Sequence, residues 1–98
     1  MAKEILSIAI FEPQTGREES FLDAVRELTA ALARGGYCRD VFYHDLNSQN
    51  QFVLLRYWKS EEARRAALED FEVLKCWSQI AQEIQTSKVY ETLSETEL

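Results

Sequence analysis

The clearest hydrophobic pattern lies in residues 52–58, where the strand-like run FVLLRYW leads into a charged segment. In an extended chain one side carries Phe52, Leu54, Arg56 and Trp58, and the other carries Val53, Leu55 and Tyr57. Both sides are mostly apolar, so we expect each face of this strand to be covered. Ser60, followed by Glu61 and Glu62, predicts a helix start after the strand.

Residues 4–11 predict a first strand that is rich in isoleucine. Its larger aliphatic side chains, which we expect under helices, are Leu6, Ile8 and Ile10. The smaller and more mixed set, which we expect to line a cavity, is Ile5, Ser7, Ala9 and Phe11. Residues 12–16 then form a turn, because Pro13 cannot donate to a sheet ladder.

Two helical regions follow from apolar positions spaced three and four residues apart. The first covers residues 17–34, with acidic residues near its start and Gly35 and Gly36 at its end. A short helix after Ser60 is interrupted near Asp70, which can cap another helix. The apolar stripe of that last helix, which we interpret as structural, is Phe71, Val73, Leu74, Trp77, Ile80, Ala81 and Ile84.

The remaining strands are predicted at 37–46 and 88–93, with residues 85–87 separating the last helix from the last strand. Residues 47–50 form the turn of a hairpin. If Leu46 faces Gln51, the register pairs Tyr43 with Leu54, Val41 with Arg56 and Arg39 with Trp58. These side chains then share one face of the sheet.

The order strand, helix, strand, strand, helix, strand predicts a single domain over residues 1–98 with an α+β, ferredoxin-like βαββαβ fold. Its antiparallel sheet carries both long helices on one face. A chain of 98 residues cannot easily bury the other face alone, so we expect a homodimer. Two facing sheets would form a dimeric α+β barrel with a lumen for a small ligand, bordered by the Trp58 face.

Charge and composition exclude some classes of binding partner. A net charge of −6 and a pI near 4.8 argue against nucleic acid and against anionic membranes. No apolar run approaches the ~20 residues of a membrane-spanning helix, and the opening residues show no small-residue cleavage signal. We therefore expect a cytoplasmic protein. Cys38 and Cys76 have no metal-binding or redox spacing, which favours reduced structural thiols.

Few residues offer chemistry. His44 is the only histidine, which excludes a histidine-rich metal site and favours a surface position. Asp40 and Asp45 are interpreted as solvated strand ends. Arg56 must reach water, meet an acid across the dimer or present its guanidinium to a ligand, and we favour pairing because buried charges are usually paired. Aromatic walls for a flat ligand could come from Trp58, Tyr43 and Tyr90, with plain packing as the alternative.

The chain resembles the antibiotic biosynthesis monooxygenase family, including quinol monooxygenase-like proteins, from Ile5 to Leu93. The segments that carry the resemblance are Gly16-Arg-Glu-Glu-Ser-Phe21, Gly36-Tyr-Cys, Phe52-Val-Leu-Leu-Arg-Tyr-Trp58 with Lys59-Ser-Glu-Glu-Ala63, and Val89-Tyr-Glu-Thr-Leu93. Many members have a histidine on the helix that follows the tryptophan. They also have a glutamate two residues before that tryptophan. Here the corresponding positions hold Ala67 or Leu68, and Arg56.

The resemblance implies a dimeric α+β barrel that oxygenates a small aromatic or quinol substrate without metal, haem or other cofactor. The family's haem-degrading branch uses an asparagine in the first strand, where this chain has Ala9 or Ser7. The candidate substrate-binding residues are Ser7, Tyr43, Arg56 and Trp58. Arg56 would stabilise a substrate anion, and Trp58 with Tyr43 would hold the ring. The competing hypothesis is a non-catalytic ligand-binding or assembly domain of the same fold.

Overall fold

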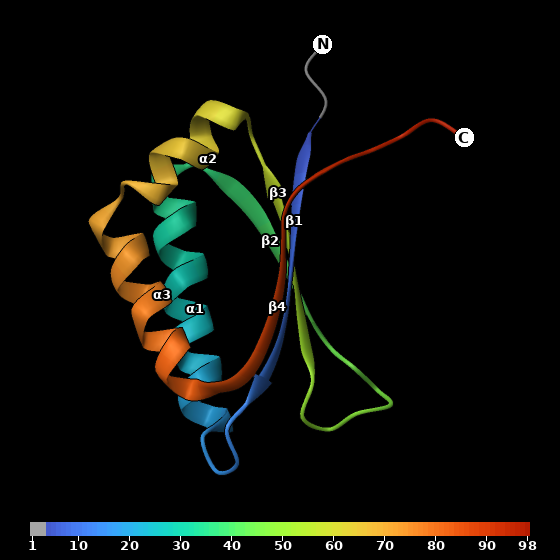
Figure 1. Cartoon of the computed structure of the whole chain (residues 1–98). Coiled ribbons are helices and arrows are strands. Elements are labelled where there is room, and N and C mark those ends of the chain that lie inside the picture. The colour runs from blue at the N-terminus through green and yellow to red at the C-terminus, as the bar shows by residue number, and fades with distance from the viewer. Residues whose placement is uncertain (1–3) are drawn as a thin grey trace.

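The structure of the protein is a computed structural model that describes residues 4–98. Within this range the chain forms four strands and three helices (Figure 1). Their order is β1 (Ile5–Pro13), α1 (Glu18–Gly35), β2 (Cys38–His44), β3 (Phe52–Trp58), α2 (Glu61–Leu68), α3 (Phe71–Glu83) and β4 (Ile84–Ser94).

The strands form an antiparallel sheet in the order β2-β3-β1-β4. All the helices lie on one face of this sheet and leave its other face bare (Figure 1). The predicted α+β, ferredoxin-like fold is therefore confirmed. None of the helices in the described range is long and apolar enough to cross a membrane.

Local sequence signals set the helix ends. Gly36 adopts a left-handed conformation (φ 67°) after α1, which a residue without a Cβ adopts at low cost. The Ser60 hydroxyl accepts a hydrogen bond from the Ala63 N–H at 3.0 Å and caps α2. The Asp70 carboxylate accepts one from the Glu72 N–H at 2.9 Å and caps α3. The predicted break near Asp70 is thus confirmed.

The hydrophobic core lies between the sheet and the helices. Its fully buried large side chains include Phe11, Phe21, Leu28, Leu32, Leu54, Val73 and Ile80. Phe11 and Phe21 meet edge to face, with ring centroids 5.5 Å apart. This contact fixes which side of β1 faces the helices.

The prediction for β1 is wrong about the larger aliphatic side chains, although Ser7 and Ala9 line a pocket as expected. Ala9 and Phe11 are buried under the helices, on the face that also carries Ser7, whereas Ile8 pairs with Leu55 on the bare face. The larger size of Leu6, Ile8 and Ile10 does not determine which side of β1 faces the helices. The register with β3 decides it, since Phe11 lies beside Phe52 and both pack in the aromatic core around Phe21.

The same finding corrects the position of the Trp58 face. Trp58 is buried on the side of the sheet that its own helices cover, rather than turned toward the bare face. A cavity beside Trp58 must therefore lie between the sheet and the helices of the same chain.

The hairpin register differs from the prediction by one residue. Phe42 pairs with Leu54, Asp40 with Arg56 and Cys38 with Trp58. The turn begins earlier than expected, because the Asp45 N–H donates to the Gln51 carbonyl at 3.0 Å and the Asp45 carboxylate accepts from the Asn47 N–H at 2.8 Å. A shift of one residue moves every β2 side chain to the opposite face.

Two expectations about the C-terminal part are also wrong. β4 starts at Ile84, directly after α3, so residues 85–87 belong to the strand rather than to a separating loop. Phe71 is 79% exposed and Leu74 is 46% exposed, so neither belongs to the buried stripe of α3. The predicted positions Val73 and Ile80 are buried, Cys76 joins them, and Trp77 and Ile84 pack against the core while partly buried.

Candidate functional site

A pocket of about 310 Å³ lies between the sheet and helices α2 and α3. The sheet side is lined by Ser7, Ala9, Leu54, Arg56 and Trp58. The helix side is lined by Arg64, Ala67, Leu68, Val73 and Trp77, and β4 adds Val89 and Glu91. Its volume is at the lower end of the ~300–1,000 Å³ typical of small-molecule sites, and its wall is mostly apolar with a few polar groups.

A chain of hydrogen bonds crosses the sheet side of the pocket. The Trp58 indole Nε1–H donates to the Ser7 Oγ at 2.7 Å. The Ser7 hydroxyl in turn donates to the backbone carbonyl of Glu91. These bonds connect β3, β1 and β4, and they fix the plane of the Trp58 ring against the pocket.

Arg56 occupies the middle of the sheet wall. Its Nε donates to Asp40 Oδ1 at 2.7 Å and its Nη2 donates to Asp40 Oδ2 at 2.9 Å. This bidentate ion pair is almost completely removed from solvent, with side-chain exposures of 5% for Arg56 and 3% for Asp40. The preferred interpretation of Arg56 as a paired charge agrees with this geometry, but the acid lies on β2 of the same chain rather than across a dimer. The expectation that Asp40 is a solvated strand end is wrong.

The Asp40 carboxylate has further donors. Thr29 on α1 donates its hydroxyl to Oδ2 at 3.1 Å, and the Cys38 thiol lies 3.5 Å from Oδ1. Among the described residues, no buried side-chain nitrogen or oxygen lacks a hydrogen-bond partner. The buried polar groups of this wall therefore satisfy one another before any ligand arrives.

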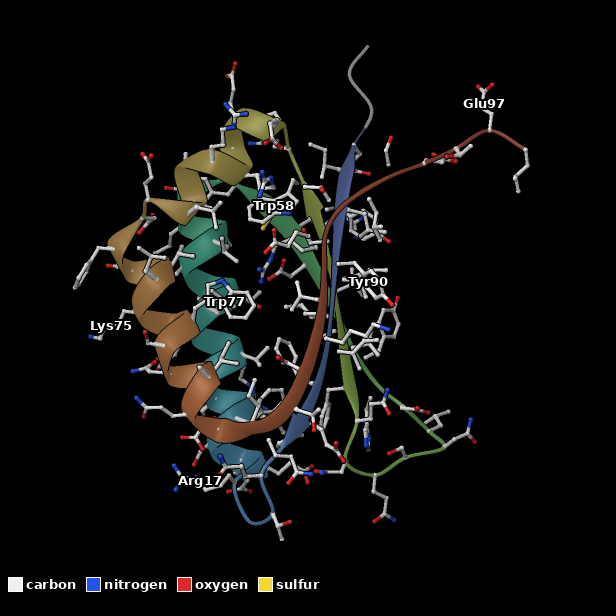
Figure 2. The ribbon with its side chains drawn as sticks, viewed as in Figure 1. Arg17, Trp58, Lys75, Trp77, Tyr90 and Glu97 are labelled. Atoms are coloured by element: carbon white, nitrogen blue, oxygen red, sulfur yellow. The ribbon has the colours of Figure 1, made fainter. Side chains whose placement is uncertain are left out.

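Both tryptophans of the chain border the pocket. The Arg56 guanidinium carbon lies 5.6 Å from the ring centroid of Trp58 and 5.6 Å from that of Trp77. Figure 2 shows Trp58 and Trp77 between the sheet and the helices, whereas Tyr90 lies on the far side of the sheet. A flat ligand entering the pocket would meet the two indole rings.

Arg64 lies at the α2 side of the pocket. It makes a bidentate pair with Glu61, at 2.9 Å from Nε and 2.8 Å from Nη2, and Arg65 adds a longer contact of 3.3 Å to the same carboxylate. Chiefly through the Arg64 hydrogen bond, these arginines lower the pKa of Glu61 from 4.5 to about 2. The guanidinium of Arg64 is thus neutralised by a neighbour on its own helix.

The structure brings together three of the four predicted site residues. Ser7, Arg56 and Trp58 all line the pocket. Tyr43 does not, because the hairpin register places it beside Val53 on the bare face, where it is 52% exposed. Tyr90 also lies on that face, so neither tyrosine forms an aromatic wall of this pocket.

Four features of the pocket do not follow from the sequence pattern. Trp77 was assigned to the structural stripe of α3, yet it supplies the second aromatic wall. Asp40 is the partner of Arg56, and only the correct hairpin register could have found it. Arg64 and Glu91 gave no signal of their own, because charged residues on a short helix and an edge strand usually face water.

His44 lies outside the pocket, as expected for a surface histidine. Its ring stacks on Phe52 with centroids 4.6 Å apart, and its Nε2 lies 3.0 Å from the Gln49 carbonyl oxygen. Across residues 4–98 no three histidine, cysteine or acidic side chains gather in a group that could hold a metal ion.

Solved structures from several bacteria share this fold. The cofactor-independent oxygenase SnoaB from Streptomyces nogalater aligns with a TM-score of 0.84 and 20% identity, covering 99% of this chain and 98% of that chain. A Pseudomonas aeruginosa protein aligns with a TM-score of 0.83 and 17% identity, covering 99% and 98%. At these identities the likeness establishes the fold alone. Comparison with curated protein sequences finds no match.

The sequence itself carries a family signature. The family model described as antibiotic biosynthesis monooxygenase matches residues 5–76. This match spans β1 through the first half of α3. It includes the pocket residues of β1, β3 and α2, whereas Trp77, Val89 and Glu91 lie beyond it. The chain belongs to the antibiotic biosynthesis monooxygenase family.

Proposed function

We propose that this protein is a cofactor-independent monooxygenase that acts on a small aromatic or quinol substrate. The observation that carries the proposal is the pocket between the sheet and helices α2 and α3, with the indole rings of Trp58 and Trp77 in its wall. An apolar cavity with two aromatic walls suits a flat ring better than a flexible or highly charged ligand.

The chemistry needs little from the protein beyond binding and exclusion of water. An electron-rich phenol or enol that loses a proton can pass electrons to dioxygen. Overall, the O–H hydrogen and one ring C–H hydrogen leave as water with one oxygen atom of O₂, and the other oxygen atom becomes a carbonyl group on that ring carbon. The chain would hold the ring against Trp58 and Trp77 and keep solvent from the intermediates.

Arg56 has a different role from the one expected. Its guanidinium is already neutralised by Asp40, so it does not supply an unpaired cation to a substrate anion. Within the proposal, Arg56 shapes the wall between the two tryptophans and the Asp40 carboxylate holds it there. Substrate binding then rests on ring contacts more than on charge.

Family membership and the fold of SnoaB, which is described as a cofactor-independent oxygenase, support this proposal. A second candidate is a non-catalytic domain that binds a small ligand. The complete pairing of Arg56 favours it, because an unpaired Arg56 would have marked a site ready for an anionic substrate. Oxygen consumption separates the two candidates.

We also propose that the protein is a homodimer. The bare sheet face carries partly exposed apolar side chains on its central strands, among them Leu6, Ile8, Ile10, Leu55 and Tyr57. Tyr43 and Tyr90 extend this surface onto the outer strands. A contiguous apolar sheet face of this kind is typical of an interface, and a second copy offers the matching surface.

A cytoplasmic location completes the proposal. Cys38 and Cys76 are free thiols, as expected for a reducing compartment. Burial is the main reason that the pKa of Cys38 is raised to about 12, and burial also raises the pKa of Cys76. Neither sulfur is therefore a reactive thiolate at neutral pH.

Oxygen-electrode assays and calorimetric titrations test the enzymatic proposal. The protein is offered a panel of phenols, hydroquinones and anthrones without added metal or cofactor. We expect saturable binding of at least one compound, with oxygen uptake above its autoxidation rate. Binding without uptake would support the non-catalytic candidate, and the absence of both would overturn the proposed function.

A further inference from the structure

The pairing of β1 with β4 is interrupted opposite Ser7. Leu6 pairs with Leu93 and Ile8 pairs with Tyr90, so Ser7 faces two residues, Glu91 and Thr92. This arrangement is a β-bulge, a feature that often lies next to active sites and redirects a side chain. The Ser7 hydroxyl fills the interruption by donating to the Glu91 carbonyl.

The bulge changes which β4 residues face the pocket. Before it, Val89 and Glu91 line the pocket, whereas Tyr90 pairs with Ile8 on the bare face. After it, Leu93 joins the bare face beside Leu6, although regular alternation would turn Leu93 toward the helices. Glu91 is therefore held at the last pocket-facing position of the strand.

The Glu91 carboxylate is available to a ligand. Among residues 4–98 it makes no hydrogen bond or ion pair, and it is the acidic side chain that lines the pocket. Arg64 on α2 interacts with Glu91 electrostatically, but its guanidinium is held by Glu61. Across the pocket, Arg56 and Asp40 neutralise each other.

The other polar groups of the wall cannot accept a proton. Arg56 and Arg64 have donors only. The Ser7 oxygen already accepts from Trp58 and donates to the Glu91 carbonyl, and the Trp58 N–H is used in the same chain. Among the described lining residues, Glu91 is therefore the side chain that can act as a base.

We propose that Glu91 is the proton acceptor of this pocket and that the pocket takes neutral hydroxylated aromatic compounds, such as phenols and hydroquinones. The ligand hydroxyl donates a hydrogen bond to the carboxylate. In turnover the O–H bond breaks, its proton moves to Glu91, and the electron pair stays on the ligand oxygen. The ring then passes electrons to dioxygen, one oxygen atom bonds to a ring carbon, and the other leaves as water with the proton from Glu91 and the hydrogen of that ring carbon. This inference rests on the proposed function for its turnover step only.

Binding of a nitrophenol tests the inference without turnover, because its visible absorption distinguishes phenol from phenolate. The full chain and Glu91→Gln are titrated with it over a pH series. A nearby carboxylate disfavours the phenolate, so the bound probe should ionise at higher pH in the parent than in Glu91→Gln. Equal ionisation in the two proteins would overturn the role of Glu91.

Turnover gives the second readout. With the best substrate of the panel, Glu91→Gln should consume oxygen about 10² to 10⁴ times more slowly, the usual contribution of a positioned base. The control is Glu97→Gln, the same change in the C-terminal tail away from the pocket (Figure 2), which should leave the rate unchanged. Circular dichroism confirms that both variants fold.

The two proposals fail in different ways. If no compound is oxidised but Glu91→Gln shifts the ionisation of bound nitrophenol, the proposed monooxygenase activity is overturned. The role of Glu91 in binding is then still supported. If the parent oxidises a compound and Glu91→Gln does so equally fast, Glu91 is not the base and the activity stands. If the parent does not bind nitrophenol at all, the inference about Glu91 is overturned.

Discussion

The guanidinium of Arg56 and the carboxylate of Asp40 form two parallel hydrogen bonds, 2.7 and 2.9 Å long, across the β2–β3 ladder. Both side chains are shielded from water by the helices and by the tryptophans beside Arg56. The pair therefore contributes to the folding of the pocket wall, and each member depends on the other for its compensation.

Asp40→Asn should strongly destabilise the protein. The amide keeps the shape of the carboxylate but leaves the buried Arg56 charge without a counter-ion, which typically costs about 3 to 5 kcal/mol. Urea unfolding measured by circular dichroism should show this loss in the unfolding free energy. An unchanged midpoint would mean that Arg56 is not buried as a charge.

The matched control is Asp23→Asn. Asp23 pairs with Arg26 at 2.8 Å on the outer surface of α1, where both side chains are more than 70% exposed. Exposed pairs contribute at most about 1 kcal/mol. This variant should unfold close to the parent, so the difference between the two substitutions measures the effect of burial.

Ligand binding should quench the intrinsic fluorescence of the protein. The chain has two tryptophans, and both border the pocket. A bound aromatic ring in contact with the indoles should give saturable quenching, and Trp58→Phe and Trp77→Phe should each retain part of it. Free tryptophan amide, titrated with the same compound, corrects for absorbance. Quenching that only follows this control would place the ligand elsewhere.

Acid should weaken the fold partly through Glu61. Its hydrogen bond with Arg64 lowers its pKa from 4.5 to about 2, so its contribution to stability is present above pH 4.5. That contribution is lost as the pH falls from about 4.5 towards 2. Glu61→Gln should therefore lose stability at neutral pH and show a flatter acid limb in urea midpoints measured across this range.

The control for this titration is Glu62→Gln. Glu62 lies next to Glu61 but makes no hydrogen bond or ion pair with the described residues. Its replacement removes the same charge from the same helix turn and should preserve the acid limb of the parent. Identical curves for the two variants would contradict the role of the Arg64 pair.

Leu55→Glu should dissociate the proposed dimer. Leu55 lies in the middle of the bare face, between Ile8 and Val41 on the neighbouring strands. A stable interface of this type commonly buries about 2,000 Å² or more, and a central carboxylate would be buried without a partner. Sedimentation velocity should show monomers for Leu55→Glu. The control is Leu46→Glu, because Leu46 lies in the hairpin turn and is 95% exposed. This variant should remain dimeric.

The sequence was sufficient for the elements and their order because helix caps and hydrophobic periodicity are local signals. Ser60, Asp70 and Gly36 mark helix ends where the structure has them. The faces of the strands were not predictable in the same way. Both sides of β1 and β3 are apolar, so periodicity alone could not say which side the helices cover.

The residues of the site could be predicted only in part from the sequence. Ser7, Arg56 and Trp58 were grouped correctly, since they share a face under any orientation of the sheet. Tyr43 and Asp40 lie on the faces opposite to those expected, because the hairpin register differs from the predicted one by one residue. Glu91 depends on a bulge opposite Ser7, and no residue type in β4 signals that interruption.

The direct junction of α3 with β4 constrains how the pocket can open. Glu83 ends the helix and Ile84 begins the strand, and Gln14 and Arg17 hold this corner through the Glu83 carbonyl and carboxylate. Motions of a wall usually turn on a few loop residues, and none separate these elements. Trp77 and Val89 should therefore move as one rigid body. Entry of a ligand would then depend on displacement of the short α2, whose link to α3 consists of Glu69 and Asp70.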